Sequence, residues 1–143
     1  MGFSYQKIKN WPFKDIEHTY TARDTMLYAL GLGFGADPMD LDQLRFVYEE
    51  NLKALPTMAA VLAGPGFWVK DPESGVDWKK VLHGEQGLVV HKPLPASGTV
   101  VGRTQITEIV DKGAGKGALA YSKREIRDKA TGELLCTVNG CSF

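Results

Sequence analysis

The sequence predicts an α+β domain in which a short buried helix is followed by a long antiparallel sheet. Strand-length segments with alternating polar and apolar residues follow one another from residue 85 to the end of the chain, separated by turns rich in glycine or proline. These connections are too short to hold crossover helices, so successive strands are expected to run antiparallel. An apolar stretch at 55–63 precedes the strands, and helices placed before a run of strands are typical of the α+β class.

Short or irregular elements are predicted on both sides of the first helix. Residues 1–15 are expected to form an irregular lead-in, with Trp11 and Phe13 packing over one end of the fold, and residues 16–20 a short strand. After the helix, we expect a polar loop over 36–44 and another short strand over 45–49.

The first helix is predicted over residues 22–32. Thr21 and Asp24 have the spacing of a capping box, in which each side chain accepts the backbone N–H of the other residue. Met26, Leu27 and Leu30 would form the buried stripe of this helix, and a group of glycines after residue 30 ends it.

The second helix is predicted to begin at Leu55, with Pro56 in the first turn, where its missing N–H removes no hydrogen bond. Residues 57–63 are apolar almost all round, which predicts a buried helix. Alanine and glycine are frequent over 54–66. Such small side chains either leave room for a ligand between helix and sheet or simply allow the two to pack closely.

Four strands are predicted in the second half, over residues 85–91, 99–110, 118–128 and 133–143, in the order of a meander. Prolines and Gly98 separate the first two strands, and a glycine-rich turn at 111–117 separates the next two. Thr131 and Gly132 turn the third strand into the fourth.

Composition describes an ordinary globular chain of 143 residues, the length of one domain. No run of 18 apolar residues could span a membrane, and the N-terminus lacks the pattern of a signal peptide. Residues 1–78 hold seven Lys and Arg against eleven Asp and Glu, a net charge of −4, whereas residues 79–143 hold ten against six, a net charge of +4. The basic half either carries solvated strand faces or meets an anion. Nucleic acid is not an expected partner, because the basic residues neither cluster nor alternate with aromatic residues.

The two cysteines, Cys136 and Cys141, lie on one predicted strand at an odd spacing, so their side chains should point to opposite faces of the sheet. A disulfide between them is therefore not expected, and both should be free thiols.

Several motifs resemble, in the same order, the N-terminal half of 2-enoyl-CoA hydratase 2, the MaoC-like part of the peroxisomal multifunctional enzyme type 2. They are residues 20–24 (YTARD), 27–31 (LYALG), 46–49 (FVYE), 55–57 (LPT), 80–86 (KVLHGEQ), 92–95 (KPLP) and 110–115 (VDKGAG). The resemblance runs from about residue 16 to the end of the chain. It implies a single hot-dog domain over residues 1–143, in which the sheet wraps around a short central helix.

The resemblance also implies where a CoA thioester substrate would bind. In the family, the His-Gly pair and the lysine of the Asp-Lys-Gly turn contact the substrate, and they correspond to His83, Gly84 and Lys112. Chemically, a glycine lets a ligand approach the backbone, and a lysine in a turn is suited to a phosphate. Without the resemblance, a histidine at a strand start and a lysine in a hairpin turn would be read as ordinary surface residues.

The residues expected near the acyl tail come only from the buried-helix argument. They are Leu55, Pro56, Met58 and Leu62.

The acid–base pair that hydration requires is not expected in this chain. The catalytic half of the family carries an Asp-x-Asn-Pro-Leu-His pattern, whereas Asp24 is followed by TMLYA and is interpreted as a helix cap. His18 precedes the predicted helix, and His91 lies at a strand end with no Asp or Glu placed beside it. We therefore predict no catalytic residue, no metal site and no cofactor, the CoA thioester being the substrate.

By resemblance, the chain is the acyl-CoA-binding half of a (3R)-specific 2-enoyl-CoA hydratase of fatty-acid β-oxidation. The catalytic pair would come from a second hot-dog repeat or from a partner subunit, and the isolated chain should form a homodimer through an exposed sheet edge. The expected location is the peroxisome in a eukaryote and the cytoplasm in a bacterium. Two alternatives stay open: an acyl-CoA thioesterase that uses Glu85, and a non-catalytic subunit that pairs with a separate hydratase subunit.

Overall fold

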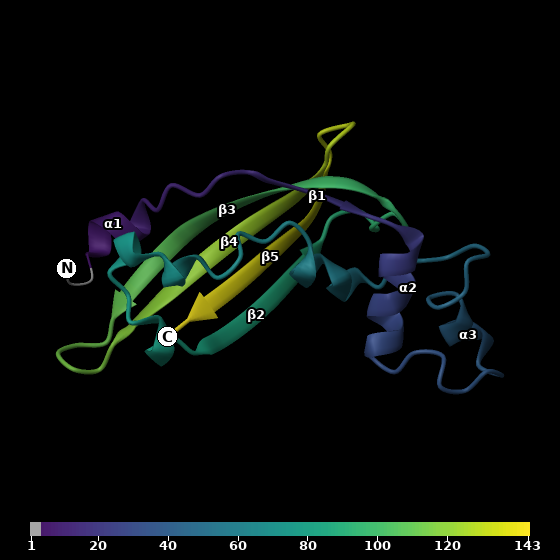
Figure 1. Ribbon diagram of the computed structural model, residues 1–143, viewed down its shortest axis with the longest axis horizontal. Coiled ribbons are helices and arrows are strands. Elements are labelled where there is room, and N and C mark those ends of the chain that lie inside the picture. The colour runs from purple at the N-terminus through teal and green to yellow at the C-terminus, as the bar shows by residue number, and fades with distance from the viewer. Residues whose placement is uncertain (1–3) are drawn as a thin grey trace.

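One five-stranded antiparallel sheet forms the frame of the molecule (Figure 1), and the computed structural model describes residues 4–143. The strands, in their order across the sheet, are β1 (Ile16–Tyr20), β3 (Gly98–Asp111), β4 (Ala118–Asp128), β5 (Leu134–Ser142) and β2 (His83–Val90). The strands predicted over 16–20, 85–91, 99–110, 118–128 and 133–143 are confirmed to within a few residues. The simple meander is confirmed for β3, β4 and β5 but wrong for β2, which pairs with β5 at the edge of the sheet.

The helices are short and lie before β2 in the chain. They are α1 (Tyr5–Lys9), α2 (Ala22–Gly31) and α3 (Leu41–Leu44), with the 3₁₀ helices η1 (Pro56–Val61), η2 (Trp68–Lys70), η3 (Pro72–Ser74) and η4 (Trp78–Lys80). The lead-in is thus partly helical, and a helix falls in the predicted polar loop. The strand predicted over 45–49 is wrong, because Asp40 caps α3 by accepting the N–H groups of Asp42 and Gln43, and turns follow directly.

The capping box that starts α2 is confirmed: the Thr21 hydroxyl accepts the Asp24 N–H, and the Asp24 carboxylate accepts the Thr21 N–H at 2.8 Å. The backbone and hydroxyl of Thr21 hold the pKa of Asp24 below its ordinary value. The predicted buried stripe is wrong, since Leu27 and Leu30 are exposed. The buried face instead holds Thr25, whose hydroxyl donates to the carbonyl of residue 96 at 2.7 Å, and Ala29.

The segment η1 and the residues after it pack on one face of the sheet and form the main core (Figure 1). The predicted helix is confirmed as a short 3₁₀ helix. Only one of its faces is buried, so the expectation that it is buried all round is wrong. Ala63 has a φ of 48° and packs directly on Gly102 of β3. Any side chain at position 102 would collide with Ala63. The N–H of Ala63 donates to Nδ1 of His18 at 3.0 Å, which fixes the end of this segment on β1.

Arg124 of β4 holds η1 from the other side. Its guanidinium donates to the carbonyls of Ala59 and Ala60, at 3.3 and 2.6 Å, and passes so close to Gly64 that a Cβ there would lie 2.8 Å from Nη1. Its Nε is buried without a partner among the described residues. Burial lowers the pKa of Arg124.

A second core cluster lies farther along the same face, toward the turn between β3 and β4. Ile8 of α1 packs there with Ile106 and Ile109 of β3. The expectation that Trp11 and Phe13 cover one end of the fold is confirmed: both rings contact Trp68, with centroids 5.1 and 5.2 Å apart.

Both cysteines are free thiols and both are buried. Cys136 packs in the main core with Ile126, while Cys141 lies beside Glu85 and Tyr121 in the sheet register. Burial raises the pKa of both thiols, and the Glu85 carboxylate adds to the effect at Cys141.

Candidate functional site

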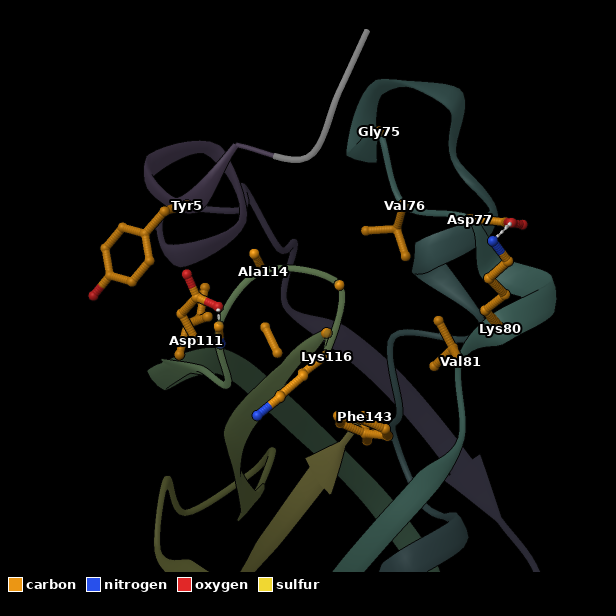
Figure 2. Close-up of a pocket in the computed structure, with 15 residues that line it drawn as sticks. Tyr5, Gly75, Val76, Asp77, Lys80, Val81, Asp111, Ala114, Lys116 and Phe143 are labelled. Carbon is orange, nitrogen blue, oxygen red and sulfur yellow. Dashed lines mark hydrogen bonds and ion pairs between the residues drawn. The ribbon is translucent and has the colours of Figure 1, made fainter.

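A cleft of about 710 Å³ opens at the end of the sheet where β3 and β4 are joined. Figure 2 shows its walls: Tyr5 of α1 and the glycine-rich turn on one side, and the segment 75–81 on the other, with Phe143 at the base. Lys80 and Lys116 both line the cleft, one on each wall. The two walls come from parts of the chain far apart in sequence, which the sheet and its ends bring together.

The glycine-rich turn is held in one shape by its own hydrogen bonds. The Lys112 N–H donates to the Gly117 carbonyl at 3.0 Å, and the Asp111 carboxylate accepts the Gly113 N–H at 2.8 Å. Three of its glycines have φ between 74° and 99°, a region that other residues rarely adopt. The N–H groups of residues 114 and 115 have no partner within residues 4–143. Together with the lysines, they can serve an anion at the mouth of the cleft.

The cleft continues inward to a narrower compartment of about 100 Å³. Five residues line both the cleft and this compartment: Val76, Val81, Ile109, Ala118 and Phe143. The inner compartment adds apolar side chains of the second core cluster, including Ile8, Trp68 and Ile106. The site therefore changes from a polar mouth, where Lys80 and Lys116 stand with Asp77 and Asp111, to an apolar interior. Such a site suits a ligand with a polar, charged handle and an apolar tail.

The three residues predicted to contact CoA lie close to this cleft in the chain, but their side chains do not line it. Lys112 follows the lining residue Asp111, and His83 follows the lining residue Val81 by two positions. His83 is exposed, with Nε2 3.4 Å from the side-chain oxygen of Gln86. Gly84 marks a bulge in β2, where a Cβ would lie 3.3 Å from the carbonyl of Cys141.

The residues predicted near an acyl tail lie elsewhere, in and around η1. Leu55, Met58 and Leu62 are buried in the molecule, and Pro56 is exposed at the start of the helix. None of the three cavities described within residues 4–143 is lined by these residues.

The carboxylates of the cleft are already engaged in local contacts. Asp77 forms an ion pair with Lys80 at 3.5 Å, and Asp111 accepts the N–H of Gly113. No histidine lines the cleft in the described part of the chain. Within residues 4–143, no group of three His, Cys, Asp or Glu side chains is arranged to hold a metal ion. The cleft thus offers groups that can bind and position a ligand.

Sequence reasoning missed most of the side chains that line the cleft, among them Tyr5, Lys80, Lys116 and Phe143. Lys116 lies in the glycine-rich turn and Lys80 is the first residue of the KVLHGEQ motif, so both belong to segments that the sequence singled out. Nothing in the sequence placed α1 or the last residue beside them.

A curved antiparallel sheet packed on one short central helix defines a hot-dog domain. The chain belongs to the family of MFE-2 hydratase 2 N-terminal domains, whose model matches residues 18–143.

Relatives with established names support this membership. The peroxisomal enoyl-CoA hydratase 2 of Arabidopsis thaliana is 33% identical over 85% of this chain and 41% of its own length. The peroxisomal multifunctional enzyme type 2 of Mus musculus is 35% identical over 76% of this chain and 16% of its own length. The crystal structure of a MaoC-like dehydratase from Phytophthora capsici superposes with a TM-score of 0.73 at 28% identity, over 98% of this chain and 48% of that one. The chain spans less than half the length of each of these proteins.

Proposed function

We propose that this chain is the acyl-CoA-binding half of a (3R)-specific 2-enoyl-CoA hydratase. The whole enzyme would add water reversibly to a trans-2-enoyl-CoA and give a (3R)-3-hydroxyacyl-CoA. The observation that carries the proposal is the change in the lining along the cleft, from lysines and N–H groups without a partner among the described residues at its mouth to apolar side chains inside. A CoA thioester has the same two parts, phosphates at one end and an acyl chain at the other.

In this proposal the chain binds and orients the substrate but does not move protons. The carboxylates of the cleft are occupied by Lys80 and by the Gly113 N–H, and Asp24 is committed to the cap of α2. A general acid–base pair would have to come from a second half, supplied by the same protein or by a partner subunit. The relatives named as hydratases are more than twice as long as the stretch they share with this chain, which leaves room for such a half.

The names of the relatives suggest the compartment and pathway in which this chain would act. The Arabidopsis and mouse proteins are named as peroxisomal, and we propose fatty-acid β-oxidation in the peroxisome for a eukaryotic source and in the cytoplasm for a bacterial one. Across residues 4–143, none of the helices has the length and apolar character needed to cross a bilayer.

A thioesterase that uses Glu85 is less well supported. Glu85 lines a separate polar hollow of about 340 Å³, with Tyr121 and Asn139, and not the cleft described above. An attacking carboxylate must reach the thioester carbon, so it would have to share a cavity with the substrate.

The isolated chain is expected to dimerise through β2. This strand lies at the edge of the sheet, and Val89 and Val90 are 47% and 43% exposed there. Unpaired N–H and C=O groups of an edge strand favour pairing with another strand, which a second copy would supply in place of a second repeat. Light scattering over a range of concentrations should show a dimer. A monomer mass at every concentration would contradict this expectation.

Calorimetric titration with a long-chain trans-2-enoyl-CoA tests the proposal directly. We expect binding without hydration, the latter followed in the same samples by the ultraviolet absorbance of the conjugated thioester. Lys116→Ala should weaken binding roughly tenfold, the effect of losing one charge-assisted contact at the mouth of the cleft. Lys112→Ala and His83→Ala, whose side chains do not line the cleft, test the contacts that the resemblance implies and should weaken binding less.

The matched control for these variants is Lys14→Ala, which removes an exposed lysine that lines none of the three described cavities. It should leave the affinity unchanged. Absence of binding would leave the non-catalytic pairing subunit as the better hypothesis, and turnover by the chain alone would overturn the assignment of catalysis to a second half.

A further inference from the structure

We infer that the exposed corner formed by Trp78, Phe67, Lys70 and Lys79 is a nucleotide site that receives the adenine ring and ribose phosphate of the substrate's CoA handle. The inference rests on the proposed function, because it takes CoA to be the ligand. It adds a subsite on η2 and η4, outside the residues predicted from sequence and outside the lining of the cleft.

Two aromatic rings meet at this corner without being buried. Trp78 is 38% exposed and Phe67 is 55% exposed, and their centroids lie 6.1 Å apart at an angle of 85°. The edge of one ring thus supports the other and leaves indole surface open to solvent. A flat indole with open surface is a platform on which any base can stack.

Two lysines stand at the same indole. Lys70 Nζ lies 4.9 Å and Lys79 Nζ lies 5.9 Å from its centroid. Neither lysine forms an ion pair with a carboxylate within residues 4–143, whereas the carboxylates nearby are engaged: Asp77 with Lys80, and Glu73 with Lys7. The corner therefore combines an aromatic surface with two available ammonium groups, the pair of features that a purine nucleotide bearing a phosphate monoester requires.

The corner adjoins the mouth of the cleft. Asp77 and Lys80, on either side of Trp78 and Lys79 in the chain, both line the wall seen in Figure 2. A nucleotide held at Trp78 would therefore send its pantetheine arm past Lys80 into the cleft. This arrangement gives the substrate a direction: nucleotide at η4, thioester between the walls, acyl chain toward the apolar compartment behind Ile109.

The test is a cycle that truncates the ligand and the protein in turn, measured by calorimetry on the 143-residue chain. The ligands are CoA, 3′-dephospho-CoA, 4′-phosphopantetheine and adenosine 3′,5′-bisphosphate. The variants are Trp78→Ala, Trp78→Phe and the double change Lys70→Ala with Lys79→Ala. Stacking of one base contributes enough that Trp78→Ala should weaken CoA about tenfold and leave 4′-phosphopantetheine unaffected. Trp78→Phe should recover part of the loss.

Lys70 and Lys79 should contribute to CoA affinity only through the 3′-phosphate of the ligand. The double lysine variant is expected to weaken CoA severalfold, to have little effect on 3′-dephospho-CoA, and to reduce the salt dependence of CoA binding. Tyr48→Ala and Lys14→Ala, which remove an exposed aromatic ring and an exposed lysine elsewhere, are matched controls and should change nothing.

The outcomes separate this inference from the proposed function. An equal loss for CoA and 4′-phosphopantetheine in Trp78→Ala would assign Trp78 a structural role and overturn the inference, as would unchanged affinity for every ligand. If an enoyl-CoA binds but adenosine 3′,5′-bisphosphate does not, the proposed function stands and the nucleotide corner falls. If the bisphosphate binds through Trp78 but no acyl chain adds affinity, the corner stands and the proposed function falls.

Discussion

Gly102→Ala is expected to lower the free energy of unfolding by roughly 3 kcal/mol, at the upper end of the usual cost of overpacking a core. A Cβ at this position of β3 would overlap the carbonyl oxygen of Ala63 and lie 2.7 Å from its Cβ. Neither neighbour can move aside as a flexible side chain would, because Ala63 is fixed in the left-handed region and bonded to His18. Urea unfolding followed by circular dichroism measures the effect.

Gly98→Ala is the matched control, since Gly98 lies on the same strand and a Cβ there meets no atom within 4 Å. Its free energy of unfolding should stay within about 0.5 kcal/mol of the parent. Equal stability of the two variants would show that the segment after η1 is free to lift from the sheet.

Arg124→Met is expected to destabilise the fold by about 2 kcal/mol. Two opposing effects decide this value. The carbonyls of Ala59 and Ala60 lose a charged donor, and such hydrogen bonds are among the stronger ones. In return, the fold no longer buries a guanidinium that has no carboxylate partner within residues 4–143 and whose Nε is unpaired. We expect the first effect to win, because methionine fills much of the space but leaves two carbonyls without a donor.

Arg103→Met provides the comparison for that variant. Arg103 also lies on the sheet, but it is exposed and its bond is with Asp15 at the surface. Its loss should have little effect on unfolding, because exposed ion pairs contribute little. A rise in stability of Arg124→Met, measured in the same urea series, would mean that desolvation of the guanidinium outweighs its hydrogen bonds.

Local sequence signals predicted where most of the helices and strands lie. Strand pairing and the choice of buried face depend on contacts between residues far apart in the sequence. The bounds of β4 follow from a glycine-rich turn on one side and the Thr131–Gly132 turn on the other, which are visible in the sequence. The pairing of β2 with β5 is not visible, because it joins segments about 50 residues apart and depends on which edge of the sheet is left open. The wrong stripe on α2 has a similar cause: the periodicity located apolar residues, but a hydrogen bond from Thr25 to residue 96 decided which face turns inward.

In the candidate site, too, the sequence predicted the local feature but not the contacts between distant segments. The turn that carries Lys112 was found, because glycines with positive φ leave a clear mark in sequence. The rest of the cleft was not predicted, since Tyr5, Phe143 and the segment 75–81 are far from the turn in the sequence and meet it only in the folded chain. The corner at Trp78 was not predicted either, because its lysines and rings lie on separate 3₁₀ helices that no periodicity connects.

The position of Phe143 at the base of the cleft, with Tyr5 on one wall, has a practical consequence for handling the protein. A purification tag fused directly after Phe143 would begin at the base of the candidate site. A bulky tag there would crowd the ligand in titrations of the 143-residue chain and should be removed first. The turn between β4 and β5 lies at the opposite end of the sheet in Figure 1, so an affinity epitope inserted at Thr131–Gly132 would stand clear of it.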